Sequence, residues 1–166
     1  MRKVYYFYWD ASALAKRYAP EIGTPLVNSL FSQVPRNRMM CLSVGTGEVI
    51  SVLVRKKNAG VIPEAAFSQA MTDFRAEVIS AVDFQLAAVE DTLVFASHSL
   101  IEKYSLNATD ALVLRSASDV VSIKRQEGHD VVLLASDRRL LNAARMEGIQ
   151  ILDPETDTQE RFGSFV

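Results

Sequence analysis

The sequence has few of the residues that several common active sites need. Its 166 residues include one cysteine, Cys41, and two histidines, His98 and His129. A single cysteine cannot form an internal disulfide, and neither histidine has a partner at the spacing that zinc sites use. A serine or cysteine hydrolase needs a histidine in a recognisable motif, and neither histidine lies in one. The sequence therefore excludes a disulfide framework and does not support a zinc enzyme or a triad hydrolase.

The glycine motifs of nucleotide-binding proteins are also missing. Gly45 and Gly47 lack the third glycine of a dinucleotide-binding fingerprint, and the sequence contains no P-loop. Asp10 is followed by Ala11 and Ser12, so the second aspartate of phosphatases that form an aspartyl-phosphate is absent.

Long apolar runs and an excess of one charge are absent too. The apolar run 4–9 is too short for a signal peptide or a membrane span. The net charge is −2, so nucleic acid can bind only through local basic patches or a bound metal. With 49% hydrophobic and 23% charged residues, the composition is that of an ordinary globular protein. We expect one cytoplasmic domain over residues 1–166, with no membrane partner.

Apolar runs alternate with helical stretches along the chain. Strands are predicted at residues 4–9, 39–44, 78–82, 131–135 and 149–152. Helices are predicted from residue 10 and at 22–31, 46–57, 63–77, 84–104, 109–126 and 137–147, with a polar tail from about 153. Strands without period-two alternation, each separated by helices, predict an α/β fold with a central parallel sheet and helices on both faces.

Two aspartates follow predicted strands. Asp10 ends the first strand, and Asp137 comes directly after the strand at 131–135. Ligands of open parallel sheets bind outside the carboxyl ends of the strands. If these two strands are neighbours, Asp10 and Asp137 share one crevice.

Two further acids lie on predicted helices with apolar neighbours. Glu48 has valines four residues before and after it, and Asp110 begins a stripe that continues through Val113 and Leu114. An isolated ionised carboxylate facing the interior costs roughly several kcal/mol unless it is paired or binds metal, so both acids need an explanation.

Each acid also has a simpler interpretation. Asp10 and Asp137 suit helix N-caps, Asp110 suits the positive end of a helix dipole, and Glu48 could pair with a basic residue. These alternatives remain open for each residue alone. The joint pattern favours a clustered acidic site, because all four positions can meet at one end of a parallel sheet.

Four short motifs that contain these acids resemble those of the PIN domain family, in the same order. They are residues 8–16 (YWDASALAK), 42–49 (LSVGTGEV), 107–117 (NATDALVLRSA) and 133–149 (LLASDRRLLNAARMEGI). The resemblance covers essentially the whole chain, and its nearest subgroup is the VapC-type toxin ribonucleases, which pair with a small antitoxin.

This resemblance implies a single PIN-like domain that hydrolyses RNA phosphodiester bonds with Mg²⁺ or Mn²⁺. Asp10 and Asp110 would be direct metal ligands, and Glu48 and Asp137 would complete the site directly or through water. Hard cations such as Mg²⁺ prefer oxygen ligands and keep several waters, which agrees with this donor set. The implied partners are RNA, a small antitoxin and a second copy of the chain. The alternative is a catalytically silent PIN-like binding or assembly module.

Other polar residues near the acids receive secondary predictions. Ser12 and Ser136 are candidate hydrogen-bond partners of the acids, although helix capping explains them as well. The candidate RNA contacts are Lys16, Arg17, Arg115 and Arg138. The cluster 55–57 is interpreted as a solvated helix end, because basic residues suit the helix dipole there.

Overall fold

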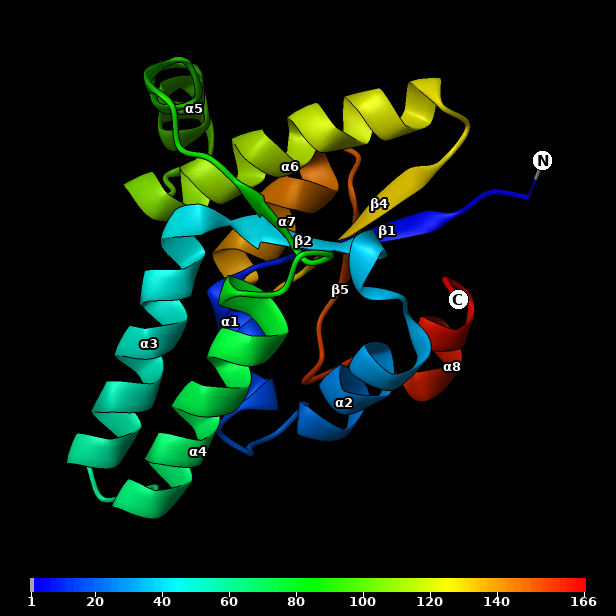
Figure 1. Cartoon of the computed structure of the whole chain (residues 1–166). Helices are drawn as coiled ribbons and strands as arrows, with labels where there is room; N and C mark the ends of the chain where they lie inside the picture. Colours follow the sequence, from blue (N-terminus) through cyan, green and yellow to red (C-terminus); the bar gives the residue numbers. More distant parts are fainter. Residues whose placement is uncertain (1) are drawn as a thin grey trace.

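The computed structural model describes residues 2–166, which form a five-stranded sheet between two layers of helices (Figure 1). The strand order is β3-β2-β1-β4-β5, and every neighbouring pair is parallel. The strands are β1 (Tyr5–Trp9), β2 (Met39–Leu42), β3 (Gln85–Ala87), β4 (Asp130–Leu134) and β5 (Gln150–Leu152). The predicted α/β fold is confirmed.

The helices divide between the two faces of the sheet. Those on one face are α5 (Asp91–Tyr104), α6 (Ala108–Gln126) and α7 (Arg138–Met146). Those on the other face are α1 (Ala11–Leu14), α2 (Thr24–Gln33), α3 (Ser43–Asn58), α4 (Glu64–Phe74) and α8 (Gln159–Gly163). Short helical turns are η1 (Ala15–Arg17), η2 (Arg36–Arg38) and η3 (Arg75–Ile79). None of the helices in residues 2–166 has the length and apolar character needed to span a membrane.

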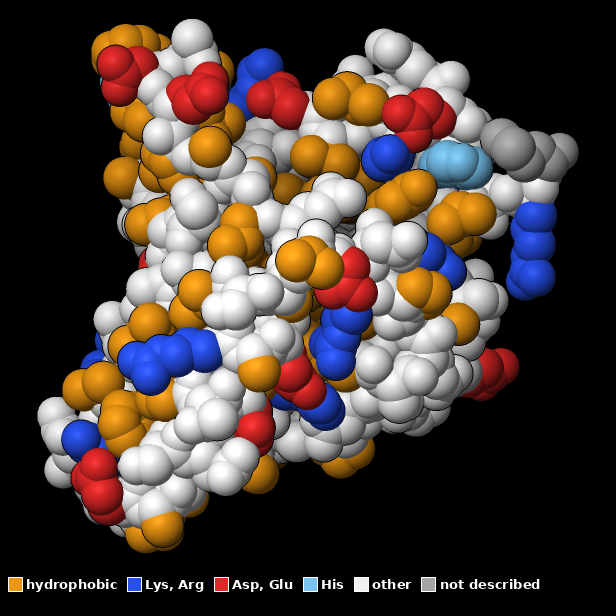
Figure 2. Space-filling view, in the orientation of Figure 1, with side chains coloured by type: hydrophobic (Ala, Val, Ile, Leu, Met, Phe, Trp, Pro, Cys, Tyr) orange, Lys and Arg blue, Asp and Glu red, His pale blue; other side chains and the backbone are white. Residues whose placement is uncertain are grey.

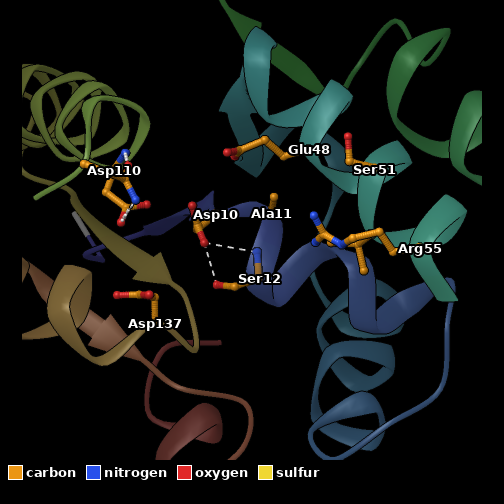
Figure 3. A pocket seen from close by; sticks show the side chains of 10 residues that line it. Asp10, Ala11, Ser12, Glu48, Ser51, Arg55, Asp110 and Asp137 are labelled. Carbon is orange, nitrogen blue, oxygen red and sulfur yellow. Dashed lines mark hydrogen bonds between the residues drawn. The ribbon is translucent and has the colours of Figure 1, made fainter. Parts of the chain in front are cut away.

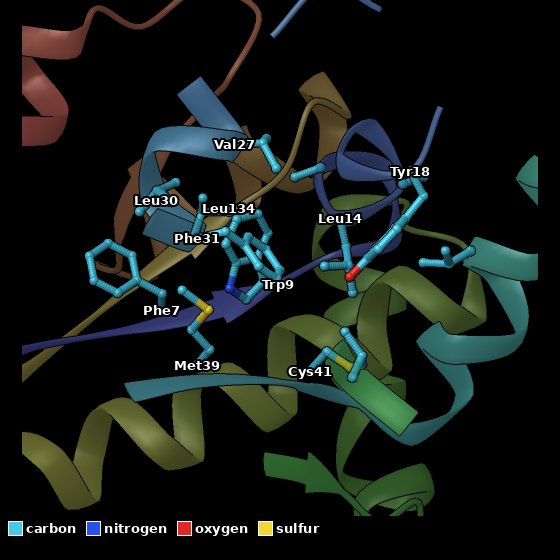
Figure 4. Packing of buried hydrophobic residues seen from close by; sticks show 14 of the residues in the cluster. Phe7, Trp9, Leu14, Tyr18, Val27, Leu30, Phe31, Met39, Cys41 and Leu134 are labelled. Carbon is cyan, nitrogen blue, oxygen red and sulfur yellow. The ribbon is translucent and has the colours of Figure 1, made fainter. Parts of the chain in front are cut away.

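The apolar sequence of β1 follows from its position between the two layers of helices. Phe7 and Trp9 pack into one core cluster, whereas Tyr8 between them packs into the cluster on the opposite face. The Trp9 ring meets the ring of Phe31 from α2 edge-on, with 5.2 Å between centroids (Figure 4). Because helices cover both faces, the strand has no solvent side and no period-two alternation.

The predicted strand 78–82 is wrong. Val78 is fully buried but belongs to the turn η3 that continues α4, and Val82 is fully exposed. Met71, Phe74 and Val78 follow helical spacing, and this period determines the local structure. The third strand is instead Gln85–Ala87, inside a stretch predicted as helix. α5 starts only at Asp91, where an acidic residue suits the helix N-terminus.

The segment predicted as a polar tail contains a short helix. Residues 159–163 form α8, which Thr158 caps by accepting a hydrogen bond from the backbone N–H of Arg161. Phe162 and Phe165 are buried against the core, and the Phe165 ring meets that of Tyr5 at 5.1 Å. These two aromatic residues dock the C-terminal segment beside β1.

The surface shown in Figure 2 carries acidic and basic side chains interspersed with each other. No broad positive field covers this face, which agrees with the net charge of −2. Attraction of a polyanion must therefore depend on smaller features next to a site.

Candidate active site

The order of the sheet places Asp10 and Asp137 at neighbouring strand ends. β1 and β4 pair in parallel with Trp9 opposite Leu134, and the Asp10 amide donates a 2.8 Å hydrogen bond to the Leu134 carbonyl. From β1 the chain first adds β2 and β3 on one side of the sheet and then β4 and β5 on the other, so the strand order reverses between β1 and β4. Open α/β sheets bind ligands in the crevice at such a reversal.

A pocket of about 370 Å³ opens at this edge of the sheet. It is lined by Asp10, Ala11, Ser12, Glu48, Ser51, Val52, Arg55, Asn107, Asp110 and Asp137. The four predicted acids thus line one pocket although they come from four separate elements. In Figure 3 Asp10 lies at the centre, with the carboxylates of Glu48, Asp110 and Asp137 around it.

Asp10 is fixed by the first turn of α1. It is the N-cap residue, and its Oδ2 accepts hydrogen bonds from the backbone N–H and the hydroxyl of Ser12. The side chain is only 5% exposed. Capping and site formation are therefore not alternatives here, because the cap holds the carboxylate at the floor of the pocket.

Asp110 and Asp137 are held by similar local contacts. Asn107 caps α6, and its side chain amide donates to Asp110 Oδ2 at 2.9 Å. Asp137 caps α7 by accepting a 2.9 Å hydrogen bond from the Leu140 amide. Glu48 projects from the first turns of α3 toward Asp10 (Figure 3).

The electrostatics of the pocket disfavour so many negative charges together. Burial raises the pKa of Glu48 to about 7, and the charges of Asp10 and Asp110 add to the rise. Burial raises the pKa of Asp110 to about 6, with further contributions from Asp10 and Asp137. Burial also raises the pKa of Asp10, although the hydrogen bonds from Ser12 act in the opposite direction. A bound cation would relieve this repulsion.

The four candidate ligands are all carboxylates, and carboxylate oxygens are ligands that hard divalent cations such as Mg²⁺ prefer. Within residues 2–166, no three His, Cys, Asp or Glu side chains are close enough together to hold one ion at once. Local hydrogen bonds hold Asp10, Asp110 and Asp137 at separate positions around the pocket. Because Mg²⁺ needs only one or two carboxylates and keeps several waters, this spacing suits a site that acts partly through water.

The two predicted serines differ in their contacts. The Ser12 hydroxyl donates to Asp10 and accepts from the Ser136 amide at 3.0 Å. The Ser136 hydroxyl donates to Asp153 instead, at 3.0 Å. Ser12 therefore supports an acid directly, whereas Ser136 acts on Asp10 only through its backbone.

The structure places Lys16 and Arg17, two of the predicted RNA contacts, outside the acidic pocket. Lys16 is 2% exposed and pairs with Glu21 at 2.9 Å and Glu155 at 2.6 Å. Arg17 donates two hydrogen bonds to Glu77 of η3. Both cations lie away from the pocket and tie the fold together.

Arg115 and Arg138 also lie outside the pocket. Arg115 pairs with Asp119 at 3.0 Å and lines a different hollow, next to the segment before α5. Arg138 follows Asp137 and lines a third hollow beside α7.

The sequence interpretation missed three polar residues of the pocket: Ser51, Arg55 and Asn107. Arg55 lies seven residues after Glu48, which is two helical turns and hence the same face of α3. That spacing could have identified it, but interpreting 55–57 as one solvated cluster hid it. Arg55 is the one cation among the residues that line the pocket in the described part of the chain.

The compared protein-family models and curated protein sequences do not match the chain. Several solved structures do have its fold. PAE2754 from Pyrobaculum aerophilum is 20% identical with a TM-score of 0.59, covering 93% of this chain and 94% of that one. VapC20 from Mycobacterium tuberculosis, a toxin that cleaves the sarcin–ricin loop, is 16% identical with a TM-score of 0.57, covering 82% and 94%. FitAcB from Neisseria gonorrhoeae is 11% identical with a TM-score of 0.59, covering 91% and 99%. At these identities the likeness shows a shared fold.

Proposed function

Because the chain has a VapC-like PIN-domain fold, we propose that it is a divalent-metal-dependent ribonuclease that hydrolyses RNA phosphodiester bonds. The observation that carries the proposal is the convergence of four carboxylates on one pocket at the carboxyl edge of the sheet. VapC20, which has the same fold, is a toxin that cleaves the sarcin–ricin loop.

The residues of the pocket have distinct roles in this proposal. Asp10 and Asp110 hold the cation, with Glu48 and Asp137 completing the site directly or through water. A bound Mg²⁺ or Mn²⁺ supplies Lewis-acid chemistry, which activates water and offsets the negative charge of the reacting phosphate. Ser12 keeps Asp10 in place, and no histidine or lysine is needed as a general base.

The raised pKa values of Glu48 and Asp110 support this assignment. They mark carboxylates that are placed at an electrostatic cost, which a purely structural role leaves unexplained. A silent binding module is the second candidate function. It is less favoured, because a module without catalysis has no need for four carboxylates around one open pocket.

We further propose a toxin role, in which a small antitoxin inserts a basic segment into the acidic pocket of a homodimer. Guanidinium groups bind carboxylates in bidentate geometry, so an arginine of the partner suits this pocket. The proposed place of action is the cytoplasm, where the RNA substrate is found.

Chelation tests the proposed function directly. Purified protein is expected to cleave RNA with Mg²⁺ or Mn²⁺, to lose this activity in excess EDTA, and to regain it when the metal is restored. Gel electrophoresis of end-labelled RNA measures the cleavage. Full activity in EDTA would remove the metal mechanism, and absence of cleavage under all conditions would favour the silent binding module.

A further inference from the structure

The hollow beside α7 that Arg138 lines contains two further arginines. It measures about 260 Å³ and lies between α7, β5 and the segment that leads to α8. The three arginines are Arg138, Arg145 and Arg161, and we call this hollow the arginine groove.

The arginine groove starts where the acidic pocket ends. Asp137 lines the pocket, and Arg138, the next residue, lines the groove. Arg138, Leu141, Asn142 and Arg145 follow i, i+3, i+4, i+7 spacing and therefore share one face of α7. This face runs about 10 Å away from the acids between Arg138 and Arg145.

The positive charges of the arginine groove are largely available to a ligand. Arg145 has its guanidinium near Asn142, a neutral side chain, at 3.1 Å. Arg161 donates to the Ile151 carbonyl and lies 3.4 Å from Asp157. Within residues 2–166, neither Arg138 nor Arg145 has a carboxylate within ion-pair distance in the structure.

The two acids that line the groove, Asp153 and Asp157, accept several hydrogen bonds. Asp153 accepts hydrogen bonds from Ser136 and from the Glu155 amide, and Asp157 accepts one from the Asp153 amide at 2.7 Å. Asp157 also lies 3.4 Å from Arg161, so the two aspartates offset part of the charge of the three arginines and leave the groove with one excess positive charge. An anion is therefore the ligand class that the arginine groove attracts.

We propose that the arginine groove binds phosphate groups of the RNA strand on one side of the bond that is cleaved. This inference rests on the proposed function and names how that site holds its substrate. Asp137 of the pocket and Arg138 of the groove are consecutive, and Ser136 contacts both Ser12 of the pocket and Asp153 of the groove. The two hollows are therefore adjacent, and an RNA strand with one phosphate among the acids can extend along α7. In Figure 3 Arg55 lies on the opposite side of Asp10 from Asp137. In this proposal Arg55 contacts the RNA on the other side of the cleaved bond.

The lining favours a phosphate backbone over an acidic peptide. The two apolar residues of the groove, Leu141 and Ile151, are 5% and 6% exposed and offer no pocket for an anchoring side chain. Peptides gain most of their affinity from such anchors, whereas backbone phosphates need cations and hydrogen-bond donors.

The test measures binding of a fluorescent oligouridylate in an Asp110→Asn background, in which the proposed function predicts no cleavage. Arg145→Ala is expected to weaken binding about threefold and to lower the slope of log Kd against log salt by about 0.7, the effect of one lost phosphate contact. Arg138→Ala together with Arg145→Ala is expected to weaken binding about tenfold. In the otherwise unchanged chain, Arg145→Ala should raise KM more than it lowers kcat.

Arg75→Ala is the matched control, because it removes the same charge from an exposed position that lines neither hollow. If Arg145→Ala and Arg75→Ala change affinity and salt slope equally while the wild type cleaves RNA, the arginine groove is not a phosphate site and the proposed function stands. If Arg145→Ala weakens binding of a polyglutamate peptide but not of oligouridylate, the groove serves an acidic peptide and the inference is overturned. If the wild type neither binds nor cleaves RNA, the proposed function is wrong, and the inference about the groove is wrong with it.

Discussion

Asp110→Asn is expected to lower RNA cleavage at least about 100-fold without unfolding the protein. Loss of a supporting residue of a metal site typically costs about 10- to 100-fold, and a direct ligand costs more. Asparagine keeps the shape of the side chain and one oxygen acceptor, so the contact with Asn107 can persist. The substitution removes one negative charge from a pocket that raises the pKa of Asp110 to about 6. Single-turnover cleavage of labelled RNA measures the effect.

Asp119→Asn is the matched control for this variant. Asp119 lies on the same helix, is half exposed and pairs with Arg115 outside the acidic pocket. It should retain cleavage within about twofold, since an exposed ion pair contributes little. Equal activity of the two variants would show that Asp110 takes no part in the chemistry.

Phe162→Ala is expected to destabilise the protein by about 3–5 kcal/mol, the usual cost of truncating a buried phenylalanine. Phe162 is 2% exposed and joins the core cluster on the face covered by α2. Its loss leaves a cavity beneath α8, which has only five residues and cannot persist without this contact. Urea denaturation followed by circular dichroism measures the change in the free energy of unfolding.

Phe95→Ala is the corresponding control, because Phe95 is 69% exposed on α5. It should change stability by less than about 0.5 kcal/mol. A Phe162→Ala variant as stable as Phe95→Ala would mean that the C-terminal segment is the undocked polar tail that its composition suggests.

The sheet was predictable where both of its faces are covered. β1 and β4 are continuous apolar runs, and their boundaries agree with the structure to within one residue. β3 is an exposed edge strand of three residues, and its weak pattern could not compete with the helical spacing around it. Residues 159–166 were missed because Phe162 and Phe165 are isolated aromatics among polar residues, and only the three-dimensional contacts show that they are buried.

The positions of the four acids could be predicted from the sequence, whereas those of the basic residues could not. Asp10 and Asp137 follow strands, Asp110 lies in the first turn of a helix, and Glu48 lies in the second turn of the helix after β2, so the topology of a parallel sheet determines where the acids lie. Lys16 and Arg17 follow Asp10 closely in sequence, but they lie on the turn η1, from which they reach Glu21, Glu155 and Glu77. Proximity in sequence was therefore a poor guide to proximity in space for long basic side chains.

The central claim is that the four carboxylates form one cation site, and magnesium-dependent thermal melting of the wild type and Asp10→Asn tests it most directly. Asparagine retains the capping oxygen that accepts from Ser12, so metal-free Asp10→Asn should melt at the same temperature as the wild type or higher. Mg²⁺ at about ten times its Kd should stabilise the wild type by about 1.4 kcal/mol, or about 3–5 °C in melting temperature, and should stabilise Asp10→Asn much less. Asp119→Asn should respond to Mg²⁺ like the wild type. A wild-type melt that Mg²⁺ does not change, together with a destabilised metal-free Asp10→Asn, would contradict the account and leave Asp10 as a helix cap alone.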